Sequence, residues 1–169
     1  MRPQKQDHIG YFEYYINLVP ENDIISALKN NGNSISSFFK SIPSDKADFK
    51  YAEGKWSIKQ LLNHIIDTER ILSYRALRFS RGDNQMVLSF DENLYADNAN
   101  LSKSDLNLLT EEFETVRKAT ILQYSQLSNI ELALKGSSPS GENSVLSIGY
   151  MLCGHATHHV NIIKERYLV

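Results

Sequence analysis

The sequence predicts an all-α fold and, within that class, a four-helix bundle. Four long segments place apolar residues three and four positions apart, which is the spacing of one helix face. No segment alternates apolar and polar residues for long enough to mark a sheet. With 169 residues, the chain can form one domain with a hydrophobic core and is too short to suggest two. We therefore expect a single helical domain over residues 1–169.

The domain is expected to begin with an arm, residues 1–19, that precedes the first long helix. Tyrosine and phenylalanine side chains in this arm require burial, which favours a short helix or an arm packed over the bundle. The first long helix, residues 20–41, is expected to begin near Pro20 and Glu21, because a proline and an acid suit the first turn. The run from Asn30 to Asn33, which includes a glycine, is a weak point in its middle.

The second helix, at about residues 57–81, has the clearest start in the chain. Ser57, followed three residues later by Gln60, forms a capping box, in which each side chain can bond to the backbone N–H of the other residue. Gly82 supplies the stop, because glycine readily takes the left-handed conformation found at helix ends.

The third helix is expected at about residues 103–127, with Ser102 and Asp105 marking its start. The link from Gly82 to Leu101 holds 20 residues, which is long for neighbouring antiparallel helices but suits a crossover along a bundle. The second and third helices are therefore expected to run parallel.

The fourth helix is expected at about residues 145–167. Residues 136–144 are polar and predict a surface loop, and Ser144 is positioned to cap the helix, which ends near Tyr167. A loop of this length suits a reversal of direction, so the fourth helix is expected to run antiparallel to the second and third.

Composition and charge exclude several classes of function. Eighteen basic and twenty acidic residues give a formal charge of −2, and no basic cluster could follow a phosphate backbone, so we expect no nucleic-acid partner. No apolar run approaches the length of a membrane span, and the N-terminus lacks the apolar core of a signal peptide. The single cysteine, Cys153, excludes an internal disulfide. We expect a cytoplasmic protein with no membrane association.

The run from Gly154 to His159 contains three of the five histidines and is the strongest indication of chemistry. His155 and His159 are four residues apart, so on a helix their side chains lie about 40° apart on one face. Two imidazoles are too few for a tight divalent site, and the expected inner face of the second helix supplies one more, His64. Three neutral nitrogens would leave open positions on the metal for water or substrate.

The alternative is that these histidines are ordinary core residues with hydrogen-bond partners, and spacing alone leaves both interpretations open. His158 lies about 60° from His155 and about 100° from His159, so it can line the rim or support a ligand rather than join the set. Cys153 lies about 160° from His155 and is expected to pack on the far side. A metal here could activate water for hydrolysis, polarise a carbonyl or hold a thiolate, and the spacing does not choose among these.

Several charged residues on the second helix have two interpretations each. Asp67 and Glu69 could accept a hydrogen bond from a ligand imidazole, but a solvated helix face is favoured for both. Arg75 and Arg78 could hold the carboxylate of a substrate or thiol cofactor, but they lie about 16–21 Å beyond His64 along the axis, so structural ion pairs are favoured.

The crossover segment Asp91 to Tyr95 could fold over the open end of the site. In that case Asp91, Glu92 or Tyr95 would bring an acid or a phenol to the reacting water. The alternative is a plain loop with exposed carboxylates. Trp56, just before the capping box, is expected to pack against the bundle.

Two segments of the sequence resemble a known family. Residues 51–70, which contain Lys55-Trp56-Ser57 and His64, are followed about ninety residues later by Gly154-His155 and His159. In this respect the chain resembles the DinB-like (YfiT/DinB) superfamily of metal-binding four-helix bundles, and the resemblance extends from about Leu18 to Leu168.

The resemblance implies a bundle of up-down-down-up topology, with the long crossover between the second and third helices. It implies one divalent transition metal ion held by His64, His155 and His159, with zinc or nickel expected and iron or manganese as alternatives. It also implies a homodimer, and activities similar to those of metal-dependent hydrolases or of thiol S-transferases and isomerases that use low-molecular-weight thiols.

We therefore expect an enzyme that acts on a small molecule, by hydrolysis or by thiol transfer, through an open three-histidine site. The rival hypothesis is a non-catalytic bundle in which the metal stabilises the fold or a dimer.

Overall fold

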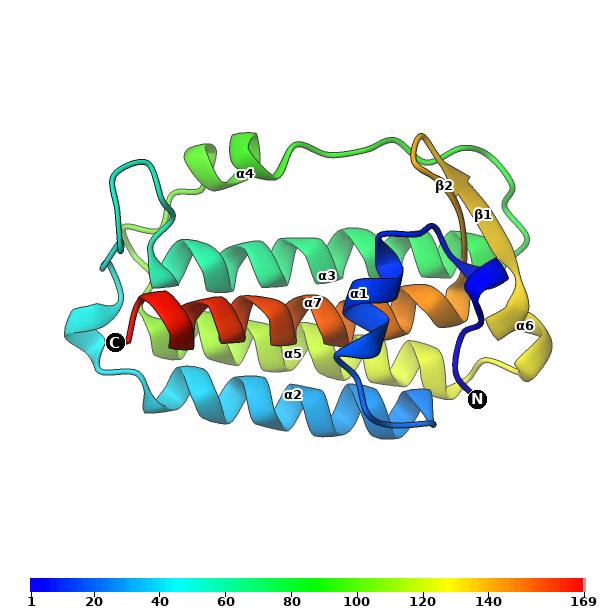
Figure 1. The fold of residues 1–169 in the computed structure, drawn as a ribbon, viewed down its shortest axis with the longest axis horizontal. Helices are drawn as coiled ribbons and strands as arrows, with labels where there is room; N and C mark the ends of the chain where they lie inside the picture. Colours follow the sequence, from blue (N-terminus) through cyan, green and yellow to red (C-terminus); the bar gives the residue numbers. More distant parts are fainter. Residues whose placement is uncertain (169) are drawn as a thin grey trace.

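Four long helices form the bundle in the computed structural model, which describes residues 1–168 (Figure 1). These helices are α2 (Ile24–Ser41), α3 (Ile58–Ser80), α5 (Leu106–Ser125) and α7 (Val145–Arg166). The prediction of an all-α four-helix bundle is confirmed in outline.

Capping side chains determine where the long helices begin. Ser57 and Gln60 form the expected capping box at α3, and the Ser144 side chain accepts a hydrogen bond from the backbone N–H of Ser147 at α7. Asp23 caps α2, so this helix begins at Ile24 rather than near residue 20. Asp105 caps α5, which is shorter at both ends than the predicted segment. Gly82, with φ of 73°, follows α3 as expected.

Hydrogen bonds at the helix ends establish the relative directions. The Tyr167 hydroxyl, after α7, donates to the carbonyl of Trp56, just before α3. The Tyr124 hydroxyl, near the end of α5, donates to the carbonyl of Val145, at the start of α7. Helix α7 is therefore antiparallel to α3 and α5, and Figure 1 shows α2 running in the same direction as α7. The directions along the chain are up, down, down and up.

Short elements cover the bundle. They are two 3₁₀ turns, Lys5–Asp7 and Ser44–Lys46, the helices α1 (Phe12–Asn17), α4 (Glu92–Asn98) and α6 (Asn129–Ala133), and the strands β1 (Lys135–Ser138) and β2 (Gly141–Ser144). Helix α1 supplies the expected burial for the arm and packs against α7. Helix α4 lies in the crossover, which returns along the outside of α3 (Figure 1).

The segment predicted as a polar loop, residues 136–144, forms most of a β-hairpin, so that prediction is wrong. Strands β1 and β2 pair antiparallel, with Lys135 opposite Ser144 and Ser138 opposite Gly141. The turn places Gly141 at φ of 123°, where residues other than glycine are strained. The hairpin was missed because serine and glycine fill it, so it lacks the apolar alternation that marks a strand.

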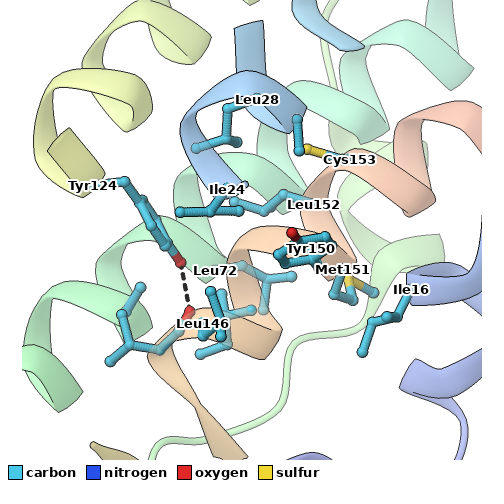
Figure 2. Close-up of a cluster of buried hydrophobic side chains, with 14 of the residues drawn as sticks. Ile16, Ile24, Leu28, Leu72, Tyr124, Leu146, Tyr150, Met151, Leu152 and Cys153 are labelled. Atoms are coloured by element: carbon cyan, nitrogen blue, oxygen red, sulfur yellow. Dashed lines mark hydrogen bonds between the residues drawn. The ribbon is translucent and has the colours of Figure 1, made fainter. Parts of the chain in front are cut away.

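The apolar core consists of two clusters along the length of the bundle. The first surrounds the N-terminal half of α7, where Tyr124, Tyr150 and Leu28 are almost fully buried (Figure 2). The second surrounds the C-terminal half of α7. On α7 the first cluster ends at Cys153 and the second resumes at Ala156, so His155 lies between them. The middle of the bundle is consequently polar.

A buried ion pair occupies part of this polar middle. The Nε and Nη2 atoms of Arg117 on α5 donate to the two carboxylate oxygens of Glu69 on α3, at 2.7 and 2.8 Å. The two side chains are only 3% and 1% exposed. Arg117 Nη1 also donates to Asn31 Oδ1 on α2, at 2.8 Å. The expectation that Glu69 lies on a solvated face is therefore wrong.

The run from Asn30 to Asn33, expected to be weak, is an unbroken part of α2. Asn31 Nδ2 donates to the carbonyl of Cys153 and to the hydroxyl of Thr157, both on α7. A Cβ atom at Gly32 would lie 2.9 Å from Arg117 Cγ, so the glycine leaves room for the buried arginine. These contacts compensate for the low helix propensity of the run. Within residues 1–168, no helix is both long and apolar enough to cross a membrane.

Candidate metal centre

The structure brings His64, His155 and His159 together between α3 and α7. His64 lies on the inner face of α3, about two turns after the Ser57 cap, and the other two lie one turn apart on α7. The Nε2 atom of His155 is 3.0 Å from Nε2 of His64 and 3.0 Å from Nε2 of His159. One ligand atom from each residue lies within 4.8 Å of the others. The three nitrogens thus converge on one point.

Burial keeps these imidazoles neutral. His64 and His155 are 9% and 6% exposed, and the three rings are in edge contact with one another. Desolvation lowers the pKa of His64 to about 4 and that of His159 to about 3, and it holds the pKa of His155 well below its usual value. The neutral form is the one that binds a metal.

Hydrogen bonds among three neutral imidazoles cannot satisfy every nitrogen atom of this cluster. In a neutral ring each nitrogen is either a donor or an acceptor, so Nε2 of His155 can make a good hydrogen bond with only one of its two neighbours. The Nδ1 atom of His159 is also buried without a partner. A cation at the centre would accept all three lone pairs. Nitrogens bound tetrahedrally to zinc at about 2.0–2.1 Å lie about 3.3 Å apart, close to the two separations of 3.0 Å from Nε2 of His155.

A cavity of about 290 Å³ opens onto the three histidines from one side. It is bounded by side chains from the arm and α1, from α3, from the crossover and from α7. Besides the histidines, its lining includes Tyr11, Phe12, Tyr15, Trp56, Thr68, Leu72, Arg75, Phe90, Glu92 and Met151. The histidine cluster is therefore accessible to a small molecule.

His158 lies beside the cluster and does not belong to it. Its Nδ1 atom is 3.0 Å from the hydroxyl of Tyr14 on α1, and its ring is in edge contact with Tyr15. Cys153 is fully buried in the apolar core, where burial raises the pKa of its thiol to about 12. Neither residue is part of the group of converging ligand atoms.

Arg75 and Arg78 of α3 have different surroundings in the structure. Arg78 forms the expected ion pair, with its Nε atom 2.6 Å from Asp83 Oδ2. Arg75 instead lines the cavity of the histidines, and its Nη2 atom donates to the carbonyl of Leu88 in the crossover, at 2.6 Å. The preference for an ion pair at Arg75 is wrong. It was based on the distance between backbone positions along the helix axis, which does not include the length and direction of the side chain. Long helical side chains lean toward the N-terminus of their helix, which here is toward His64.

The acids near the site also have separate positions. Asp67 accepts a hydrogen bond from Asn63, and burial raises the pKa of its carboxyl, but it lines a different cavity. Asp91 caps α4, and Tyr95 lines the same cavity as Asp67. Glu92 alone of the three crossover candidates lines the cavity of the histidines.

Some residues of the site could not be assigned from the sequence. Tyr15 of α1 lies with its ring centre 5.8 Å from that of His155, and Trp56 lies 4.9 Å from His64. The aromatic content of the arm indicated burial but not its location. The expected packing role of Trp56 is confirmed, and the residue also lines the cavity.

Comparisons with known proteins bear on the family and the fold of this chain. The sequence profile of the DinB superfamily matches residues 27–163, which include all three histidines. Among solved structures, the chain is similar to YfiT from Bacillus subtilis, described as a probable metal-dependent hydrolase with an unusual four-helix bundle topology. The TM-score is 0.74 over 98% of this chain and 90% of that one, at 14% identity, which shows a common fold. No curated protein matches the chain. Because the family match extends over most of its length, this protein belongs to the DinB superfamily.

Proposed function

We propose that this protein is a metal-dependent enzyme that acts on a small molecule, either as a hydrolase or as a thiol S-transferase. The observation that carries the proposal is the convergence of the Nε2 atoms of two buried histidines and one partly buried histidine at an accessible cavity. The description of YfiT as a probable metal-dependent hydrolase supports the hydrolytic form.

Three neutral imidazoles suit a divalent transition metal such as zinc or nickel. His64, His155 and His159 would provide three ligands, and a fourth position would face the cavity. A metal bound there would polarise a carbonyl or lower the pKa of a water or thiol in the cavity.

Glu92 is the residue that we assign to proton transfer. Glu92 lines the cavity together with the three histidines, and its negative charge favours protonation of His64. A carboxylate in this position can accept the proton of an attacking water or thiol and pass it to the leaving group. The aromatic side chains of Trp56 and Tyr15 border the histidines and exclude bulk water from part of the cavity.

The test is the metal dependence of catalysis in protein purified without an affinity tag. Metal-free protein and protein reloaded with zinc or nickel would be assayed for hydrolysis of p-nitrophenyl esters and for conjugation of a small thiol to monobromobimane. We expect activity only after reloading. Glu92→Gln should lower kcat by about a hundredfold or more without loss of metal.

His158→Ala is the matched control for His159→Ala, because the two neighbours differ in whether they belong to the converging cluster. The control should keep both metal and activity. If the reloaded protein holds its metal but none of the substrates or thiols can reach it, the catalytic proposal fails and the rival hypothesis of a structural metal is favoured.

A further inference from the structure

Arg75 is a half-buried cation without an anionic partner. Its neighbours Arg70, Arg78 and Arg81 each pair with a carboxylate. Arg75 pairs with none in residues 1–168, and its contact with the Leu88 carbonyl uses one nitrogen of the guanidinium group. Burial disfavours the charged form and lowers the pKa of Arg75. A partly desolvated guanidinium with free donors is a site for an anion.

Thr68, in the same cavity, carries a second unpartnered polar group. Its side chain is 4% exposed and its Oγ1 atom has no hydrogen-bond partner. Each of the other four threonines, all helical, donates to the carbonyl four residues earlier (Thr110, Thr115, Thr120 and Thr157). Thr68 alone makes no such hydrogen bond, and it lines the cavity. An unsatisfied buried hydroxyl is costly unless a ligand or water bonds to it.

His64, Thr68 and Arg75 form one stripe along α3. At 100° per residue, Thr68 lies about 40° and Arg75 about 20° from His64 around the helix axis. A molecule lying along this stripe would meet the imidazoles at one end, a hydroxyl in the middle and a guanidinium at the other end.

We propose that this cavity binds a small molecule with a carboxylate at one end and a polar group in its middle, with Arg75 as the specificity-determining residue. The inference rests on the proposed function, because it places the reacting end of the molecule at the three histidines. The Arg75 guanidinium binds the carboxylate, and the Thr68 hydroxyl bonds to the polar group between the two ends.

The charge and size of the cavity favour a carboxylate over a phosphate. Arg75 is the one cationic side chain in the lining apart from the metal site, so a single guanidinium is available at that end of the cavity; it matches the single charge of a carboxylate and would leave one charge of a phosphate dianion uncompensated there. The volume of about 290 Å³ is at the lower end of the range for ligand pockets.

The experiment compares two probes that differ only at one end. N-(mercaptoacetyl)-β-alanine carries a thiol for the metal, an amide in its middle and a terminal carboxylate, and its primary amide derivative is the neutral match. Binding to the cobalt-loaded protein would be measured by calorimetry, and contact of the sulfur with cobalt by its charge-transfer absorption. The acid should bind about ten- to a hundredfold more tightly than the amide.

Variants separate the two residues. Arg75→Gln should abolish the preference for the acid while leaving the affinity for the neutral amide unchanged. Thr68→Val should weaken both probes equally. Arg78→Gln, which removes a neighbouring cation outside the cavity, should retain the preference.

Equal affinities of the acid and the amide for the unaltered protein would overturn the inference, whatever the variants do. If the Arg75→Gln variant still binds the acid more tightly than the amide, the assignment to Arg75 is wrong. If the acid gives no heat of binding in calorimetry, the proposed carboxylate site is wrong. A preference for the acid without charge-transfer absorption has a different meaning: it would support the carboxylate site and contradict the open metal position of the proposed function.

Discussion

The candidate metal centre of this protein is built from single residues placed in the polar middle of the bundle. Three histidines interrupt the apolar faces of α3 and α7, where leucine or isoleucine would otherwise pack. They are tolerated there as neutral rings, since three adjacent imidazolium ions would repel one another in a desolvated site.

The metal-free protein should therefore lose stability in mild acid. Below pH 6.5 the imidazoles of the unfolded chain take up protons, whereas in the folded chain His64 does so only near pH 4 and His159 near pH 3. The unfolded state then binds more protons, so the free energy of unfolding falls as the pH drops from about 6.5 to 4, by up to about 1.4 kcal/mol per pH unit for each histidine. Urea denaturation after chelator treatment measures this.

His64→Gln removes one of these titrating groups and should make the slope shallower. A slope that is the same in the variant and in the unaltered protein would show that His64 is already hydrated or charged in the folded state.

At the scale of elements, one helix contributes both to the candidate site and to a buried ion pair. One face of α3 presents His64, Thr68 and Arg75 to the cavity, while Glu69 lies on a different face and joins α3 to α5 through Arg117. The same arginine reaches α2 through Asn31 and the carbonyl of Leu28. The ion pair therefore fixes three of the four long helices at the level of the histidines.

Breaking this ion pair on one side should be strongly destabilising. Arg117→Met leaves the Glu69 carboxylate buried without its partner, and we expect a loss of about 3–5 kcal/mol in the free energy of unfolding. The double variant Glu69→Gln with Arg117→Met should recover part of this loss. The exposed pair Arg70 and Glu112 is the control, and Arg70→Met should cost less than about 1 kcal/mol. Equal effects at both sites in chemical denaturation would contradict this assignment.

The close approach of α1 to α7 should also be sensitive to substitution. A Cβ atom at Gly154 would lie 2.0 Å from the carbonyl oxygen of Tyr15, so Gly154→Ala must push α1 away from the histidines. We expect a loss of about 1–3 kcal/mol or more and faster hydrogen exchange in α1. Gly10→Ala, where a Cβ atom would meet nothing within 4 Å, is the control. Unchanged exchange in α1 would show that it does not depend on this contact.

At the scale of the whole molecule, local signals were sufficient to predict the four long helices of the bundle. The capping box at Ser57, the stop at Gly82 and the cap at Ser144 depend on neighbours in sequence and are found as expected. The histidine set also followed from local geometry, because two of the histidines share one helix face and the third lies on a helix with its own clear start.

What the sequence did not reveal depends on partners far away along the chain. Glu69 is buried because Arg117, 48 residues later, neutralises it. Arg75 enters the cavity because the crossover returns to place Leu88 and Glu92 beside it. The hydrophobic periodicity of one helix cannot detect either arrangement. A charged residue that is buried with a distant partner and one that is solvated are both read as polar positions in that pattern.

The most direct test of the central claim is the metal content of protein purified without a metal-affinity tag, measured by mass spectrometry of the elements. We predict about one divalent transition metal ion per chain, retained in His158→Ala and lost in His64→Ala. Finding no bound metal in the folded, unaltered protein, even after incubation with zinc or nickel, would contradict the claim.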